Sequence, residues 1–237
     1  MIDLSTGSVP VVKRLVIIST AVGLCLALPT LEASTSEAST GTVPASTVTK
    51  IFGGGTWSVV ANVGAMSRTV YKGAITSPKS CSLRAVVTGA SRSQRLYYGP
   101  TLFPSFWGPE AGITTYQFSS ATKAKAGLAQ VRGNVNNCRS FTVTYAKSSP
   151  RLINSFAIKR SSLSTRIADV GSDSFGWRET GTFWTWHGSA TLVAAVKGSR
   201  VVVTRYELTG DSGTTALPKS TVASPTETVD LADVALD

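Results

Sequence analysis

The chain has 237 residues, 42% of them hydrophobic, and a formal net charge of +10. This length allows one sizeable core or two small ones. Residues 50–208 carry twenty Lys and Arg against five acids, whereas residues 209–237 carry five acids and one Lys, so a basic body ends in an acidic tail. A basic body favours anionic partners, although the same charge also serves solubility alone.

Residues 1–33 predict an export signal. Lys13 and Arg14 precede an apolar run that ends at Pro29, and a basic start before a short apolar stretch is typical of secretory signals. The run is shorter than the roughly 20 residues of a membrane span. Two interpretations stay open: a cleaved signal, or a retained anchor that would associate the protein with the membrane. Both place the protein outside the cell or at its envelope.

A tether separates this segment from the folded part. Residues 34–50 are rich in Ser and Thr and have no core-forming pattern, which predicts a disordered linker. We therefore expect folded structure over residues 51–237.

Residues 118–143 carry the clearest local pattern. Ser119 or Ser120 can cap a helix, and its apolar residues recur at steps of three and four, on one face. These residues are Ala121, Ala124, Leu128, Val131, Val135 and Cys138. The apolar face is thin, so we expect the helix to lie close against a sheet. After Cys138 the sequence alternates as a half-buried strand.

The remaining elements are mostly extended. We expect strands at residues 113–118, 182–186, 190–196 and 201–208, the last two joined as a hairpin with a turn at 197–199. Ser224-Pro225-Thr226-Glu227 matches a capping box with proline at the first helical position. This motif predicts a short acidic helix from Pro225 to about Leu236.

The cysteines predict one disulfide. Cys25 leaves with the signal or stays in the anchor, which leaves Cys81 and Cys138 in an exported chain. A Cys81–Cys138 bond is the expectation, and two free buried thiols are the alternative.

The order of motifs over residues 68–236 resembles the PknH-type extracellular sensor domain, the outer module of an actinobacterial receptor Ser/Thr kinase that also occurs in free secreted proteins and lipoproteins. The resemblance is carried by SPKSC at 77–81, RLYYG at 95–99, the helix and its cysteine at 118–138, VGSDSFGWR at 170–178 and the hairpin ATLVAAVKGSRVVVTRYE. It implies a single α+β domain in which two or three helices pack a twisted, mostly antiparallel sheet around a cleft. The implied role is binding of an extracellular ligand.

The sequence departs from that family in two ways. The family pattern has two disulfides, whereas this chain can form one. The kinase motifs are also absent: there is no Gly-rich loop, no His-Arg-Asp catalytic loop and no second hydrophobic span. The resemblance therefore implies the sensor module alone.

Catalytic and metal motifs are weak. Ser212 lies in GDSG, the serine-protease core sequence, but the only histidine, His187, has no suitable carboxylate partner in chain order. One histidine and two mature cysteines cannot form a His/Cys metal cluster, and Asp169 with Asp173 supplies too few oxygen ligands for calcium. We predict no enzyme activity, no cofactor and no metal.

The binding hypothesis depends on charge and aromatic residues. The proposed ligand is an anionic or amphiphilic component of the cell envelope, and the candidate contacts are Arg95, Tyr97, Arg160, Trp177 and Arg178. Nucleic acid is disfavoured because the chain has no RNA- or DNA-binding motif. Two alternatives are a secreted hydrolase that uses Ser212 and His187, and a structural surface protein that makes contacts through the aromatic loop at 103–107.

Overall fold

The computed structural model covers the whole chain and describes residues 42–59, 75–81, 87–100, 106–144, 155–163, 170–183, 186–211 and 225–237. All of these lie in one compact unit, Ser39–Asp237; the other unit is Met1–Ala38. The predicted export signal, the loop at 103–105 and Ser212 lie outside the described residues. Among the described residues, no helix is long and apolar enough to span a membrane.

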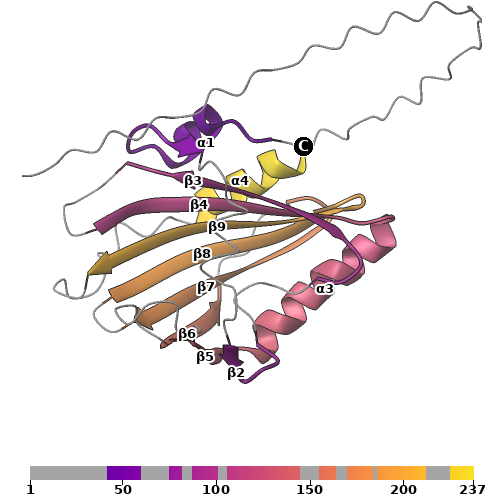
Figure 1. Ribbon diagram of the computed structural model, residues 1–237. Coiled ribbons are helices and arrows are strands. Elements are labelled where there is room, and N and C mark those ends of the chain that lie inside the picture. The colour runs from indigo at the N-terminus through magenta and orange to yellow at the C-terminus, as the bar shows by residue number, and fades with distance from the viewer. Residues whose placement is uncertain are drawn as a thin grey trace, which may run out of the picture. The chain divides into compact units, whose positions relative to one another are not determined.

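The described elements form one antiparallel sheet with three helices (Figure 1). They are α1 (Ala45–Phe52), β1 (Ser58–Val59), β2 (Ile75–Ser77), β3 (Ser91–Tyr98), β4 (Phe106–Gln117), α3 (Ala121–Asn137), β5 (Ser140–Thr144), β6 (Ser155–Ser162), β7 (Asp173–Phe183), β8 (Trp186–Lys197), β9 (Arg200–Asp211) and α4 (Pro225–Leu236). The nine strands are ordered β1-β3-β4-β9-β8-β7-β6-β5-β2. The predicted α+β class with a mostly antiparallel sheet is confirmed.

Alternate residues of the central strands pack into two separate hydrophobic cores, one on each face of the sheet. One face, here called the α4 face, packs α1 and α4 against β3, β4, β8 and β9. Its core residues include Tyr97, Val193, Val202, Tyr206 and Leu231. Because strand side chains alternate with period two, the neighbours of these residues point to the other side of the sheet.

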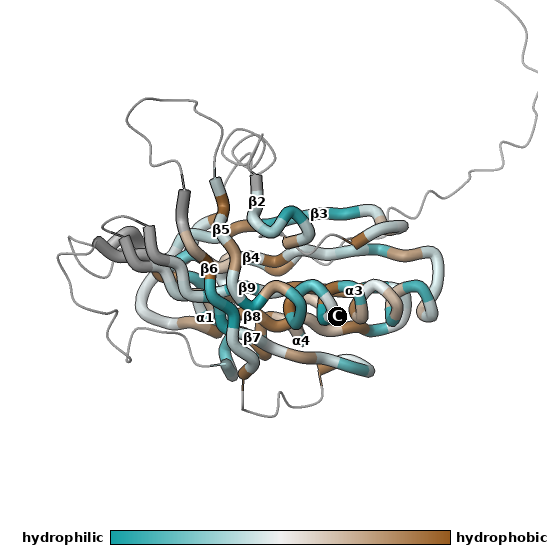
Figure 2. Tube along the Cα trace, turned by 90° about the horizontal axis from the view of Figure 1, so that it is seen from below, coloured by the Kyte–Doolittle hydropathy of each residue, from teal (hydrophilic) through white to brown (hydrophobic). Residues whose placement is uncertain are grey.

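The opposite face, here called the α3 face, is covered by α3 over β7, β8 and β9. Leu128, Val131 and Val135 of α3 pack on strand residues such as Leu192 and Val201. Figure 1 shows α3 and α4 on opposite sides of the sheet, and Figure 2 shows hydrophilic and hydrophobic segments alternating along the strands and α3. The alternation of apolar residues along the strands therefore supplies the side chains of both hydrophobic cores.

The two ends of α3 match the prediction. The Ser120 hydroxyl accepts a hydrogen bond from the Lys123 amide at 3.3 Å, and the helix ends at Asn137. Cys138 follows and is bonded to Cys81, with Cα atoms 5.5 Å apart. The predicted disulfide is confirmed, and it packs with Phe141 and two other apolar side chains of β5 and β6.

Several predicted boundaries were wrong. The tether does not extend to residue 50, because α1 already begins at Ala45, where Val48 has a fully buried side chain. Strand β4 begins at Phe106, inside the expected aromatic loop. The expected strand at 182–186 is divided, since β7 ends at Phe183 and β8 begins at Trp186. His187 is a strand residue of β8, paired with Thr182 and Gly210.

Candidate functional site

The five predicted contact residues do not form one site. Cross-strand partners share a face, and the register places Tyr97, Ala111, Tyr206, Thr191 and Arg178 in one row on the α4 face. Arg95 lies two residues before Tyr97, on the same face. Trp177 and Arg160 point to the α3 face, together with Glu179. Because Trp177 and Arg178 are consecutive residues of a strand, their side chains point to opposite faces of the sheet.

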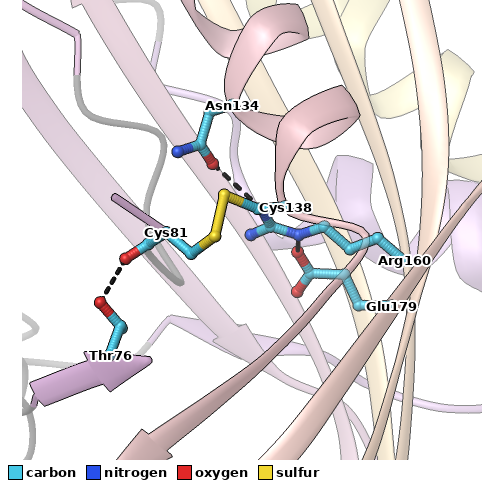
Figure 3. The surroundings of a disulfide bond; sticks show 6 residues. All are labelled: Thr76, Cys81, Asn134, Cys138, Arg160 and Glu179. Atoms are coloured by element: carbon cyan, nitrogen blue, oxygen red, sulfur yellow. Dashed lines mark hydrogen bonds and ion pairs between the residues drawn. A yellow bond between two sulfur atoms is a disulfide. The ribbon is translucent and has the colours of Figure 1, made fainter. Parts of the chain in front are cut away.

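On the α3 face, Arg160 is the centre of a buried polar network (Figure 3). Its Nε donates to Glu179 Oε1 at 2.7 Å, and its Nη1 donates to Asn134 Oδ1 at 3.0 Å. Trp177 Nε1 donates to the same Glu179 oxygen at 3.1 Å, and the guanidinium lies 4.7 Å from the centre of the Phe141 ring. The side chains of Arg160 and Glu179 are 2% and 4% exposed. Arg160 and Trp177 thus hold α3 to the sheet and offer almost no surface to a ligand.

Arg95 and Tyr97 belong to the other side of the molecule. Tyr97 is completely buried, and its hydroxyl donates to the Val43 carbonyl at 2.6 Å, which ties the chain before α1 to β3. Burial raises the pKa of the Tyr97 phenol, and the nearby Arg95 partly offsets that rise. Arg95 is half-buried and lies 5.9 Å from the centre of the Tyr97 ring. Of the five predicted contacts, only Arg95 and Arg178 therefore retain exposed surface.

Arg178 belongs to a part of the α4 face that the described helices do not cover, because α4 packs on β8 and β9. We call this part, on β5, β6 and β7, the hydroxyl face; its residues are Ser140, Thr142, Lys159, Ser161, Arg178 and Thr180. Four of the six carry hydroxyl groups and two are cations. Among the described residues, this face has no acidic side chain. The predicted contact Arg178 is thus joined by Lys159, which was not among the predicted contacts.

The inner border of the hydroxyl face carries two polar atoms without partners. Arg178 Nε and Thr191 Oγ1 are both buried and make no hydrogen bond within the described residues. The two residues are direct cross-strand partners, so these atoms lie on neighbouring strands of the same face. Buried polar groups are almost always satisfied in folded proteins. Thr191 is fully buried and Arg178 is half-buried, so of these two residues only Arg178 has exposed surface.

A pair of carboxylates was missed by the sequence reasoning. Glu110 of β4 and Glu207 of β9 are direct cross-strand partners on the α3 face, and Arg205 Nη2 lies 2.7 Å from Glu207 Oε2. Burial, and secondarily the charge of Glu207, raises the pKa of the Glu110 carboxyl, while Arg205 lowers it. The two acids are far apart in sequence, so only the strand register could have revealed the pair.

For the catalytic and metal-binding candidates, the described residues show no arrangement that supports either role. Ser212 lies outside the described residues, so its position relative to His187 is not described. Asp173 forms an ion pair with Arg132 of α3 at 2.9 Å, and Asp169 is also outside the described residues. Within the described ranges, no group of three His, Cys, Asp or Glu side chains is placed to hold a metal ion.

Comparisons with known proteins reach only the level of the fold. No protein-family model matches the sequence, and no curated protein is similar to it. The extracellular domain of PknH from Mycobacterium tuberculosis is similar in structure, with 12% identity, coverage of 82% of this chain and 90% of that chain, and a TM-score of 0.49. A second similar structure is an uncharacterised protein from Mycobacterium smegmatis, the Rv0999 ortholog, with 10% identity, coverage of 76% and 84%, and a TM-score of 0.35. The first is the type of domain that the sequence motifs resemble, and at these values neither likeness assigns a ligand to this chain.

Proposed function

We propose that this protein is an exported, non-enzymatic, sensor-like domain that binds an anionic glycan of the cell envelope on its hydroxyl face. The observation that carries the proposal is the pair of cations Lys159 and Arg178, which have no acidic partner within the described residues and lie among hydroxyl groups on that face. Export is supported by the Cys81–Cys138 disulfide, since such bonds persist in oxidising compartments.

The charges of the hydroxyl face favour an anion. Lys159 and Arg178 make no ion pair within the described part of the chain, and Lys159 is exposed. A guanidinium presents a planar set of donors that matches phosphate, sulfate or carboxylate groups. An anionic ligand would neutralise both cations, whereas a neutral ligand would leave them uncompensated.

The hydroxyl groups favour a glycan over the surface of a lipid bilayer. Ser140, Ser161 and Thr180 are exposed on this face and can donate and accept hydrogen bonds. The large apolar side chains that are exposed in the described residues, Val59, Tyr98 and Val234, lie on other elements. Insertion into a bilayer needs apolar groups at the contact. The anionic part of the predicted ligand class is therefore favoured over the amphiphilic part.

The experiment compares binding of the full chain to three probes: a sulfated heparin octasaccharide, neutral dextran, and vesicles of phosphatidylglycerol and phosphatidylcholine. The variant Lys159→Gln/Arg178→Gln removes both cations of the face. The matched control, Lys123→Gln/Lys125→Gln, removes the same charge from exposed positions of α3. We expect the first variant to lose about tenfold or more in affinity for the octasaccharide, since hydrogen bonds to charged groups contribute about 1.5–3 kcal/mol each.

Three results would overturn the proposal. The first is an equal loss in the control, which would indicate attraction to net charge alone. The second is unchanged binding by the hydroxyl-face variant. The third is a dependence on Lys159 and Arg178 for vesicles but not for the octasaccharide, which would replace the glycan with a membrane surface.

A further inference from the structure

A shallow cavity, largely open to solvent, lies at the turn between β8 and β9, away from the residues of the hydroxyl face. Its volume is about 330 Å³, and its polar lining comes from Gln117, Lys197, Ser199, Arg200 and Asp237. The hairpin pairs Lys197 with Arg200 around the two-residue turn Gly198-Ser199, and Gly198 has a φ of 56°, a conformation that glycine adopts without strain. The tight turn therefore places the cations Lys197 and Arg200 and the Ser199 hydroxyl around the same cavity.

The cavity already holds one anionic group of the protein itself. Asp237 Oδ1 lies 2.6 Å from Lys197 Nζ, and this hydrogen bond and the carboxylate charge raise the pKa of the Lys197 amine. Arg200 makes no ion pair within the described residues. Two cations, Lys197 and Arg200, thus line the cavity with one carboxylate, Asp237, and Asp233 lies close enough to raise the Lys197 pKa as well.

The hydroxyl of Ser199 is also available to a ligand. Its oxygen accepts a hydrogen bond from Gln117 Nε2 at 2.7 Å. A serine hydroxyl can still donate its own hydrogen when its oxygen accepts. Lysine, arginine and serine donors around one small volume are the set that binds tetrahedral or planar oxyanions.

We propose that this cavity binds a small oxyanion, such as a phosphate, sulfate or carboxylate group, which displaces the Asp237 carboxylate from Lys197. Displacement costs little, because the side chains of Lys197 and Asp237 are 56% and 68% exposed and solvent strongly screens exposed ion pairs. The incoming anion gains contacts with the Arg200 guanidinium and the Ser199 hydroxyl. Asp237 thus acts as an internal competitor that sets the affinity of the site.

The experiment titrates inorganic phosphate into the full chain at constant ionic strength and follows backbone amide resonances by NMR. We expect the amides of residues 197–200 to shift in a saturable way. Asp237→Asn should bind phosphate up to about fivefold more tightly, which corresponds to removal of an exposed ion pair. Lys197→Gln/Arg200→Gln should abolish the saturable shift. Asp230→Asn is the matched control, since it removes the same charge at another exposed position of α4.

Each alternative result has a defined meaning. Equal tightening by Asp230→Asn and Asp237→Asn would show an effect of net charge and would overturn the competition. Saturable shifts confined to β5, β6 and β7 would overturn the cavity site and leave the hydroxyl face standing as the phosphate-binding surface. Shifts at residues 197–200 that survive Lys197→Gln/Arg200→Gln would also overturn it.

Discussion

Strands β6 and β7 have opposite roles on their two faces. On the α3 face, Arg160 is buried and bonded to Glu179 and Asn134. On the hydroxyl face, Lys159 and Arg178, each adjacent in sequence to a member of that network, have no acidic partner in the described residues. A buried charge requires a partner because desolvation is costly, and an exposed one does not. Pairing therefore separates cations that stabilise the fold from cations that are available to a ligand.

The largest effect is expected from breaking the buried network. Arg160→Met should lower the free energy of unfolding by about 3–5 kcal/mol, because it leaves the Glu179 carboxylate buried without its cation. Urea unfolding measures the loss. The double variant Arg160→Met/Glu179→Leu should recover part of it, since two apolar residues remove the uncompensated charge. A loss below 1 kcal/mol for Arg160→Met would contradict the assignment of Arg160 to the fold.

Removal of the disulfide beside that network should have an effect of similar size. Cys81 and Cys138 are 57 residues apart, so in the chain-entropy model Cys81→Ser/Cys138→Ser should lose about 4 kcal/mol of unfolding free energy. The measurement is urea unfolding with and without dithiothreitol. The reductant should destabilise the wild type and leave the variant unchanged. If the reductant has no effect on the wild type, the two thiols are not bonded in solution.

The elements that could be predicted from sequence were those with local signals. The cap at Ser120, the thin apolar face of α3, the hairpin turn at Gly198 and the capping box before α4 each lie within a few residues of the structure they specify. The disulfide followed from counting cysteines. In contrast, α1 lies in a Ser/Thr-rich stretch, and its helix depends on tertiary packing of Val48 and Phe52 on the core.

The site was harder to predict because it depends on strand register. The predicted contacts grouped Arg160, Trp177 and Arg178 because of their charge and aromatic character. The alternation of β6 and β7 sends Arg178 to one face and the other two to the opposite face. The alternation along β7 could have separated Trp177 from Arg178 in the sequence, whereas the face of Arg160 relative to them depends on the β6–β7 register. The pairing of Glu110 with Glu207 could not have been foreseen, since it joins segments almost a hundred positions apart.

A smaller effect is expected at Glu110, on the part of the α3 face over β4 and β9. Like charges directly opposite each other destabilise a sheet by up to about 1 kcal/mol, so Glu110→Gln should raise the unfolding free energy at pH 7 by a few tenths to about 1 kcal/mol. The raised pKa of Glu110 means that the folded state holds the proton more tightly than the unfolded state. The wild type therefore loses stability as pH rises through the Glu110 pKa in the folded state.

The pH dependence tests this explanation. The advantage of Glu110→Gln should be full at neutral pH and disappear below the ordinary glutamate pKa of 4.5, where the wild-type carboxyl is protonated in both states. Urea unfolding at pH 7 and pH 4 gives the two differences. An advantage that is equal at both pH values would come from packing and not from charge.

The smallest effect on stability is expected on the hydroxyl face. Lys159→Gln and Arg178→Gln should each change the unfolding free energy by less than about 0.5 kcal/mol, as is usual for exposed or half-exposed positions without partners. Arg178→Leu should raise it slightly, because the variant removes the buried Nε that has no acceptor in the described residues. If Arg178→Gln instead destabilises the protein as strongly as Arg160→Met, Arg178 is a structural cation. Loss of octasaccharide binding with unchanged unfolding would, in contrast, separate recognition from folding on a single pair of strands.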